Sequence, residues 1–357
     1  MAGPKVLIAG LACATALSLG GCAAYVVPAH PNPGNVTLTR AAATSTPFDI
    51  TGYAEDGDTT KAQLKASTKA MTMVGVDGVN LTPDGDGITA PDDTVLGLLH
   101  DAHAEGDTAQ LLVSNYSDAI GDFDDSLAEK MFGDPAKMTD VVTAITNEVT
   151  TDGWDGITID LESLNGWGAE GHTRDDNAGL DAFVTQLAAA IGAERISICL
   201  TATEGSYADL GYDLATIGSH VGHVVLMAYD QHGPTWSKAG AVGGYPWVKA
   251  SLNQLLKGVA ASRIQLGIAG YGYSWAHGKQ QKTGDQYSDK QARAYVKKHH
   301  ATAHWSSTQK EWHATLANGT VIWWSDAKSY KDRKALAKSK QLGGIAVWSL
   351  GQSDPLR

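Results

Sequence analysis

The sequence predicts an α/β protein that folds as one closed (β/α)8 barrel, a TIM barrel, with a small α+β insertion between its seventh and eighth strands. The chain has 357 residues. A barrel of roughly 250 residues with an insertion uses most of this length, although two domains of average size would also fit. The composition, with 43% hydrophobic and 18% charged residues, is typical of a folded globular protein. From Pro47 onward, short β-rich runs alternate with helical patterns, which indicates consecutive βαβ units around a parallel sheet.

We expect the eight β-rich runs to form the barrel strands, at residues 48–53, 70–81, 109–115, 156–162, 195–201, 221–229, 263–271 and 343–348. Between them, apolar residues recur at helical spacing, for example at 138–149, 178–191, 246–259 and 327–339. The longest departure from this rhythm is the segment 274–325, between the seventh and eighth runs. We expect this segment to form an α+β lobe on the rim of the barrel and one wall of a cleft.

The first residues of the chain indicate export. Lys5 precedes an apolar run at residues 6–19, which is too short to cross a bilayer because a spanning helix needs about 20 apolar residues. The run ends in the sequence L-G-G-C, which resembles the lipobox of a bacterial lipoprotein signal. The resemblance implies a signal peptide at residues 1–21 and a lipid anchor on Cys22, at the extracellular face of the cell membrane. The alternative is an ordinary signal peptide cut nearby, which also means export.

Residues 22–45 are expected to be a flexible tether, because prolines and scattered threonines are typical of a linker. The folded domain then covers residues 46–357. Of the three cysteines, Cys13 falls in the signal peptide and Cys22 carries the anchor. Cys199 is left alone in an apolar run, so no disulfide framework is predicted.

The charge of the chain excludes one class of partner. Lys and Arg number 27 against 39 Asp and Glu, a formal net charge of −12, and no run of basic residues suits nucleic acid. The 12 histidines show no metal-binding spacing, so neither a metal nor a cofactor is predicted. The expected partners are a substrate and, through Cys22, the membrane. We expect the chain to be a monomer.

The fourth β-rich run carries the residues with the clearest chemical meaning. Apolar residues alternate with polar ones there, so the isoleucines and leucine share one face while Thr158, Asp160 and Glu162 share the other. Helices cover the outside of a barrel, so the two carboxylates must point inward. An unpaired buried charge costs several kcal/mol, so this placement needs a functional reason. Glu162 stands at the C-terminal end of the strand, where active sites of this architecture lie, and Asp160 disfavours its ionisation. A protonated Glu162 can serve as a general acid.

The same segment resembles a known family. Residues 155–162 are similar to D-G-x-D-x-D-x-E, the fourth-strand signature of glycoside hydrolase family 18. The resemblance continues at 227–230, similar to the family's sixth-strand M-x-Y-D, and at 265–273 and 343–348, similar to its seventh and last strands. Four matches in the family's order make the resemblance specific, and it is closest to the chitinase-like, bacterial cell-wall and spore-cortex-lytic N-acetylglucosaminidases.

The resemblance implies a hydrolase of β-1,4 linkages in N-acetylglucosamine-containing glycans, with peptidoglycan first, then chitin oligomers or N-glycans. Glu162 would protonate the glycosidic oxygen while the substrate's own 2-acetamido group attacks the anomeric carbon, a scheme without a protein nucleophile. Asp160 would orient the acetamido group, and Tyr229 would bond to its oxygen. The resemblance implies Asp230 and Trp348 in substrate binding, with Asp155 as a supporting residue. Tyr53 and Tyr271 are further candidates for substrate binding, because they lie at predicted strand ends. Asp155 falls on the other side of the alternation, so a structural role at the start of the strand is an equal alternative.

Several positions keep a second interpretation. Thr158 stands where the family motif often has an Asp, which bears on the pKa of Asp160. Asn115 and Tyr273 lie at predicted strand ends and would reach a sugar there. His232, two residues after Asp230, is the one histidine expected near a ligand. The tryptophans of the insertion, Trp305, Trp312, Trp323 and Trp324, either stack on sugars or form the lobe's own core, and we favour the core.

Two other functions compete with the hydrolase. Barrels of this kind include lectin-like members that have lost the acid, but Glu162 is present here. A metal-assisted hydrolase would need histidine ligands beside Asp160 and Glu162, and the sequence offers none at the strand ends.

Overall fold

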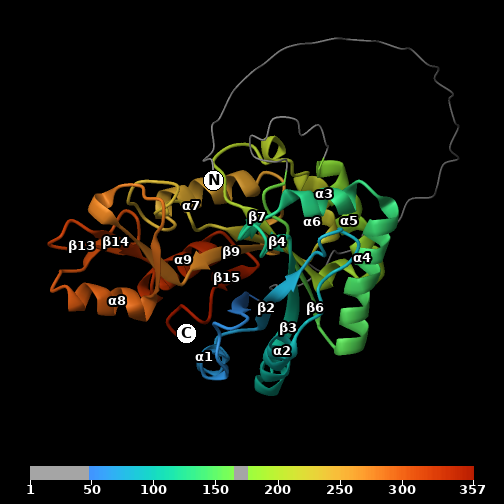
Figure 1. Ribbon diagram of the computed structural model, residues 1–357, viewed down its shortest axis with the longest axis horizontal. Coiled ribbons are helices and arrows are strands. Elements are labelled where there is room, and N and C mark those ends of the chain that lie inside the picture. Colours follow the sequence, from blue (N-terminus) through green and yellow to red (C-terminus); the bar gives the residue numbers. More distant parts are fainter. Residues whose placement is uncertain (1–47, 165–175) are drawn as a thin grey trace, which may run out of the picture. The chain divides into compact units, whose positions relative to one another are not determined.

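The computed structural model describes residues 48–164 and 176–357. The predicted signal peptide, Cys22 and the tether therefore lie outside the described residues. Eight parallel strands close into a barrel in the order β1-β15-β9-β8-β7-β6-β3-β2 (Figure 1). They are β1 (Asp49–Glu55), β2 (Met73–Asn80), β3 (Thr108–Ser114), β6 (Gly156–Asp160), β7 (Ile196–Thr201), β8 (His223–Met227), β9 (Ile264–Ala269) and β15 (Gly344–Trp348). Each predicted run overlaps one of them, which confirms the (β/α)8 barrel.

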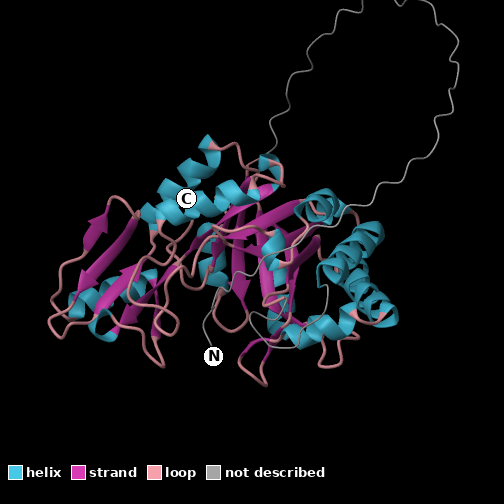
Figure 2. Cartoon of the chain, turned by 90° about the horizontal axis from the view of Figure 1, so that it is seen from above, coloured by secondary structure: helices cyan, strands magenta, loops and turns pink. Residues whose placement is uncertain are grey.

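Helices surround the barrel strands (Figures 1 and 2). They are α1 (Lys61–Ser67), α2 (Asp93–Glu105), α3 (Asp125–Phe132), α4 (Pro135–Asn147), α5 (Asp176–Ile191), α6 (Leu214–His220), α7 (Tyr245–Leu255) and α9 (Ala327–Ser339). Their ends follow local chemistry: Asp92 caps α2 by accepting hydrogen bonds from the amides of Thr94 and Val95, and Gly106 ends that helix with a left-handed φ of 90°. The four expected helical stretches correspond to α4, α5, α7 and α9, with ends shifted by a few residues.

Two layers of side chains fill the space around and inside the barrel. The outward-facing residues of the strands, such as Ile157 and Ile159 of β6, pack with the helices into the main hydrophobic core and are almost fully buried. The interior holds a smaller cluster that includes Leu112 and Val225. Polar residues also enter the interior in hydrogen-bonded pairs, Thr51 with Gln265 at 2.9 Å and Thr158 with Gln110 at 2.9 Å. These pairs are neutral, while His223 and Asp49, at the N-terminal ends of β8 and β1, meet at 3.3 Å.

The insertion between β9 and β15 forms an α+β lobe. An antiparallel sheet in the order β11-β10-β14-β13-β12 packs with helix α8 (Asp289–Lys298). Its strands are β10 (Tyr271–Trp275), β11 (Asp285–Ser288), β12 (His304–Ser306), β13 (Glu311–Thr315) and β14 (Val321–Trp324). The lobe sheet begins at Tyr271, earlier than the expected boundary at 274, because the chain leaves the barrel after Ala269.

The tryptophans of the lobe are mainly structural. Trp324 is 1% exposed and stacks on Trp312, with ring centroids 6.3 Å apart. Both belong to the lobe's own core with residues of α8. Trp305 packs edge-on against Trp312 and carries the ammonium of Lys328 on its ring face.

A buried ion pair ties the lobe to the barrel. Glu311 of β13 and Arg333 of α9 are each at most 1% exposed, and their side chains meet at 2.8 Å. Glu311 also accepts hydrogen bonds from the amides of Val242 and Gly243, in the segment that follows β8. One carboxylate therefore joins the lobe, the last helix and the segment that leads from the sixth barrel strand into α7 (Tyr245–Leu255).

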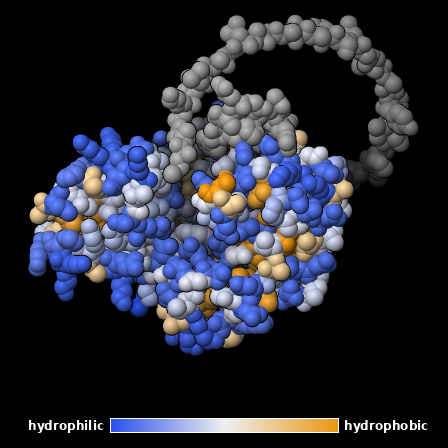
Figure 3. All heavy atoms as spheres, viewed as in Figure 1, coloured by the Kyte–Doolittle hydropathy of each residue, from blue (hydrophilic) through white to orange (hydrophobic). Residues whose placement is uncertain are grey.

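The face of the molecule shown in Figure 3 is dominated by hydrophilic residues, with only small hydrophobic patches. Over the described ranges, no helix combines the length and the apolar character that a membrane crossing requires.

We predict that Arg333→Met lowers the free energy of unfolding by about 3–5 kcal/mol, because Glu311 would remain as a buried charge without its partner. Urea unfolding followed by tryptophan fluorescence measures the loss. The control is Lys61→Ala, which breaks the exposed pair with Asp101 and is expected to cost about 0–1 kcal/mol. A loss for Arg333→Met no larger than that of the control would show that the buried pair is not needed.

Candidate active site

A cavity of about 580 Å³ opens at the C-terminal ends of the barrel strands. Five carboxylates line it: Glu55, Asp77, Asp160, Glu162 and Asp230. Four aromatic side chains share the lining, Tyr116, Phe123, Tyr229 and Trp348, and the remaining residues are Gly78, Asn80, Ser114, Met227 and Gln286. Among the described residues that line this cavity there is no Lys, Arg or His. The cavity is therefore acidic and has no counter-charge in its wall.

Glu162 is fixed through its backbone. Strand β6 ends at Asp160, so Glu162 lies just beyond the strand rather than in it. Asn115, which follows β3 and is fully buried, accepts a hydrogen bond from the Glu162 amide at 2.8 Å and donates one to the Glu162 carbonyl at 2.9 Å. The same Asn115 amide also donates to the carbonyl of Asp124. Asn115 does not line the cavity; it holds the residue that does.

Burial and neighbouring charges keep protons on the carboxyl groups at the centre of the site. The pKa of Glu162 is raised well above its usual range by burial first, and then by the charges of Asp160, Asp230 and Asp122. The pKa of Asp160 is raised to about 7, by burial and then by Asp77. A carboxyl group that holds its proton near neutral pH can donate it to a leaving group.

Two tyrosines of the lobe hold Asp230. The hydroxyl of Tyr271 donates to Asp230 Oδ1 at 2.7 Å, and that of Tyr273 donates to the same oxygen at 3.0 Å. Asp230 has a left-handed φ of 58°, and its carbonyl accepts a hydrogen bond from the indole of Trp236 at 3.2 Å. Tyr271 is 2% exposed and lies behind Asp230 instead of lining the cavity. It therefore holds Asp230 and does not face the space that a substrate would occupy.

Trp348 and Tyr229 form the aromatic part of the cavity wall. Trp348 ends β15, and the ring of Tyr53 packs beneath it with centroids 5.4 Å apart. Tyr53 is 1% exposed, and its hydroxyl lies 3.8 Å from the sulfur of Cys199 inside the barrel. Tyr53 therefore supports Trp348 from below and, like Tyr271, does not line the cavity.

The structure does not bring Asp155 into this site. Asp155 precedes β6, at the end of the strand opposite Glu162. Its carboxylate interacts with His103 of α2 at 2.8 Å and accepts a hydrogen bond from the amide of Ala109 at 2.8 Å. The expected substrate contact is therefore corrected to a structural one at the start of the strand. His232 also lies outside the cavity lining, with its ring nitrogen 2.8 Å from the carbonyl oxygen of Ala241.

Three groups in the cavity wall had not been expected from the sequence. Glu55 ends β1, and a carboxylate at the C-terminal end of a barrel strand was the available signal for it. Asp77 lies inside β2, three residues before the strand ends at Asn80. The third is the short hairpin of β4 (Tyr116–Ser117) and β5 (Asp122–Phe123), in which Tyr116 and Phe123 meet edge-to-face at 5.8 Å. No periodic pattern marks so short a hairpin.

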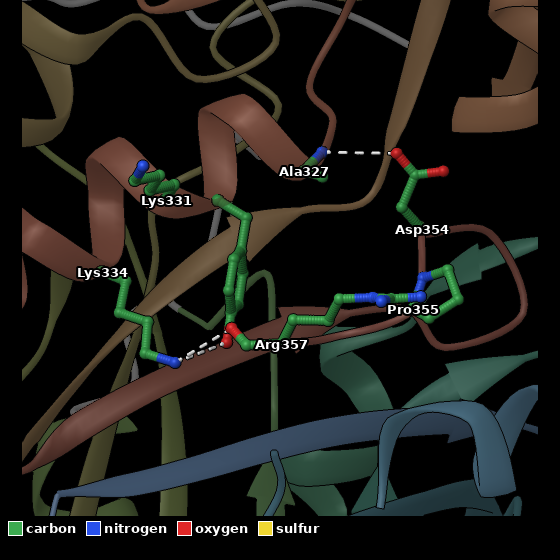
Figure 4. Close-up of a pocket in the computed structure, with 7 residues that line it drawn as sticks. Ala327, Lys331, Lys334, Asp354, Pro355 and Arg357 are labelled. Atoms are coloured by element: carbon green, nitrogen blue, oxygen red, sulfur yellow. Dashed lines mark hydrogen bonds between the residues drawn. The ribbon is translucent and has the colours of Figure 1, made fainter. Parts of the chain in front are cut away.

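A second cavity, of about 530 Å³, lies beside α9 and the last residues of the chain (Figure 4). There the ammonium of Lys334 donates to the carbonyl of Arg357 at 3.2 Å, and Asp354 is paired with Arg293 and with the amide of Ala327. Its polar groups are largely engaged with one another, and it holds no cluster of acids comparable to that at the barrel mouth.

Comparison with known families assigns the chain to one of them. The model of the family described as "Glycosyl hydrolases family 18" matches residues 109–353, which is more than half of the chain. The chain belongs to this family. Family 18 membership makes the protein a glycoside hydrolase, and the matched region contains Asp160, Glu162, Tyr229, Asp230 and Trp348.

Individual relatives agree with the family 18 assignment. The "Uncharacterized glycosylase YvbX" of Bacillus subtilis is 27% identical over 252 residues, which is 67% of this chain and 70% of that protein. Two solved structures share the fold with a TM-score of 0.74. The chitinase of Chromobacterium violaceum is 21% identical over 86% of this chain and 95% of its own. The spore cortex-lytic enzyme SleL of Bacillus cereus is 20% identical over 87% of this chain and 72% of its own.

We predict that Asn115→Ala lowers kcat by about 10- to 100-fold with little change in KM, because Glu162 loses the side chain that fixes its position. Hydrolysis of a soluble N-acetylglucosamine oligomer measures both constants. The control is Asn318→Ala, which removes an exposed side chain bonded to the amide of Thr320. An unchanged kcat in Asn115→Ala would mean that the backbone of Glu162 needs no such support.

Proposed function

We propose that this family 18 enzyme hydrolyses β-1,4 linkages of N-acetylglucosamine-containing glycans with retention of configuration, by substrate-assisted catalysis. The observation that carries the proposal is the cavity at the barrel mouth, in which Glu162 lies with Asp160, Tyr229 and Trp348; the raised pKa of Glu162 supports it. A carboxyl group that stays protonated beside a second carboxylate suits a reaction in which one donates a proton and the other stabilises a cation.

In the first step, Glu162 gives its proton to the glycosidic oxygen. The carbonyl oxygen of the substrate's 2-acetamido group attacks the anomeric carbon, and the bond from that carbon to the leaving oxygen breaks. The product is a positively charged oxazolinium-like ring and a free sugar hydroxyl. Asp160 orients the acetamido N–H and stabilises the positive charge, Tyr229 donates a hydrogen bond to the acetamido oxygen, and Trp348 forms an apolar floor.

In the second step, water attacks the anomeric carbon from the side that the leaving group vacated. Glu162, now ionised, takes a proton from that water, and the bond to the acetamido oxygen breaks. The acetamido group and the protonated Glu162 are both restored, and two displacements give net retention. Asp230 stands beside this subsite, held by Tyr271 and Tyr273.

We propose peptidoglycan as the first substrate, followed by chitin oligomers and N-glycans. Support comes from the spore cortex-lytic SleL among the similar structures and from the "Putative sporulation-specific glycosylase YdhD" of Bacillus subtilis. YdhD is 24% identical over 274 residues, 73% of this chain and 63% of that protein. The similarity to chitinases makes chitin oligomers the second choice.

We also propose that the enzyme acts as a monomer on the extracellular face of the cell membrane, anchored through a lipid on Cys22. The L-G-G-C sequence that ends in Cys22 supports the anchor.

We predict products from peptidoglycan when the protein is incubated with purified peptidoglycan, chitin oligomers and a high-mannose glycoprotein in parallel. Mass spectrometry of the released sugars ranks the three substrates, and proton NMR of freshly formed product, recorded before mutarotation, reports the configuration at the new reducing end. Release from chitin oligomers alone would replace peptidoglycan as the substrate. Release from none of the three would end the hydrolase proposal for these glycans.

We predict that Glu162→Gln lowers kcat by about 10²- to 10⁴-fold while glycan binding is kept, because the amide fills the same space but donates no acidic proton. Glu204→Gln, which changes an exposed carboxylate outside the cavity, is the matched control. If the Glu162→Gln protein hydrolyses the glycan as fast as the control, Glu162 is not the acid.

We predict that activity falls as the pH rises through the pKa of Glu162. The protonated form is the active one, and because this pKa is raised, the loss occurs well above the range of an ordinary glutamate. The dependence of kcat/KM on pH reports the limb in the free enzyme. A kcat/KM profile that stays flat from mildly acid to alkaline pH would contradict the assignment of Glu162 as the acid.

A further inference from the structure

Strand β2 contains a bulge at the edge of the cavity. Its pairing with β3 runs in register from Met73 to Val76, which faces Leu111, and resumes at Val79, which faces Val113. Three steps along β2 therefore oppose two along β3. The extra residue lies in the pair Asp77-Gly78, between the two registers.

The bulge changes which side chains of β2 reach the cavity. In a regular strand, Val76 and Val79 would point to opposite faces. Here both are fully buried in the core between the barrel and its helices. Asp77 and Asn80 can consequently both line the cavity. Gly78 makes this path feasible, since its φ is +143° and a Cβ there would lie 2.6 Å from a methyl group of Val95 on α2.

Asp160 has little other polar support. It is 5% exposed, its Oδ1 has no hydrogen-bond partner, and its carboxylate accepts a hydrogen bond from the thiol of Cys199. Thr158, two residues earlier on the same face of β6, is neutral and donates its hydroxyl proton to Gln110. The ionisable groups that act on or respond to Asp160 are Asp77 of β2, Tyr53 of β1, Cys199 of β7, Tyr212 after β7, Tyr229 after β8, and Glu162 on its own chain segment. Among these groups, Asp77 is the carboxylate that another strand supplies.

We propose that Asp77 is a positioning residue that acts through Asp160: the carboxylate that the bulge places in the cavity controls the proton that Asp160 holds. The inference rests on the proposed role of Asp160 in stabilising the positively charged intermediate. While Asp77 is charged, Asp160 keeps its proton to a higher pH. Without that charge, the Asp160 anion forms at lower pH and is available there to stabilise the intermediate.

The proton affinities of the two groups agree with this arrangement. Burial raises the pKa of Asp77 to about 6, and Asp56 adds to the effect. Burial and then Asp77 raise the pKa of Asp160 to about 7. Two carboxyl groups with similar affinities in one cavity titrate as a coupled pair near neutral pH.

The test compares the acid limb of the kcat/KM–pH profile, which reports the free enzyme, in wild type, Asp77→Asn, Asp77→Glu and Asp77→Asn/Thr158→Asp. The substrate is a soluble N-acetylglucosamine oligomer. Asp77→Asn is expected to move the acid limb down by about half to one pH unit. Asp77→Glu is expected to keep it near the wild-type position. The double variant is expected to move the limb back up, since its carboxylate lies beneath Asp160. Glu55→Gln is the control for the limb, because Glu55 lines the same wall but is not among the charges that act on Asp160.

An acid limb that stays in place in Asp77→Asn overturns the inference, even if kcat falls. A shift of the same size in Glu55→Gln also overturns it, because the effect would then belong to the total charge of the cavity. If Asp77→Asn does not fold, the pKa of Asp160 is measured in wild type and in Asp77→Glu by NMR titration of its carboxyl resonance. An Asp160 pKa near that of an exposed aspartate in both proteins overturns the inference. Failure of the proposed function is distinguishable, because it is seen in the wild type as absence of hydrolysis.

Discussion

Five carboxylates share one cavity, and the described residues around them supply no cation. Each charge that forms there raises the proton affinity of the others, as the effects of Asp77 on Asp160 and of Asp160 on Glu162 show. This arrangement lowers stability at higher pH. Because the folded chain holds these protons more tightly than the unfolded chain, the free energy of unfolding decreases as the pH rises from the ordinary aspartate value of 3.8 through the folded values of about 6 to 7. The same burial and neighbouring charges raise the pKa of Glu162, which is the group proposed to donate a proton.

The rest of the structure keeps these groups in place. Beneath the carboxylates, the barrel interior holds two neutral hydrogen-bonded pairs, Thr51 with Gln265 and Thr158 with Gln110. Asn115 fixes the backbone of Glu162 from β3, and the lobe fixes Asp230 through Tyr271 and Tyr273. The lobe is itself tied to α9 and to the segment after β8 by Glu311 and Arg333. The Glu311–Arg333 pair, which does not line the cavity, thus contributes to the position of Asp230 in the cavity wall.

The barrel and the centre of the site could be predicted because both follow from periodicity. Alternation along residues 156–162 places Asp160 and Glu162 inside, and the end of the strand places Glu162 at the mouth. The positions of the remaining site residues depend on local irregularities of the backbone and on packing, which the alternation of polar and apolar residues does not predict. The bulge at Asp77 adds an acid to the cavity, and the early departure of the chain after Ala269 moves Tyr271 into the lobe. Tyr53 is covered by Trp348, and Asp155 is at the wrong end of its strand. A strand end predicts that a side chain is near the cavity, but packing determines whether it reaches it.

The central claim is that Glu162 holds a proton where an ordinary glutamate does not. The most direct measurement is the titration of its side-chain carboxyl carbon by NMR in protein labelled at glutamate, with the resonance assigned by its absence in Glu162→Gln. In wild type, the midpoint for Glu162 is expected well above the ordinary glutamate range. In Asp160→Asn, the midpoint is expected to be lower, because a neighbouring charge is removed. A midpoint in the ordinary range, unchanged by that replacement, would contradict the central claim.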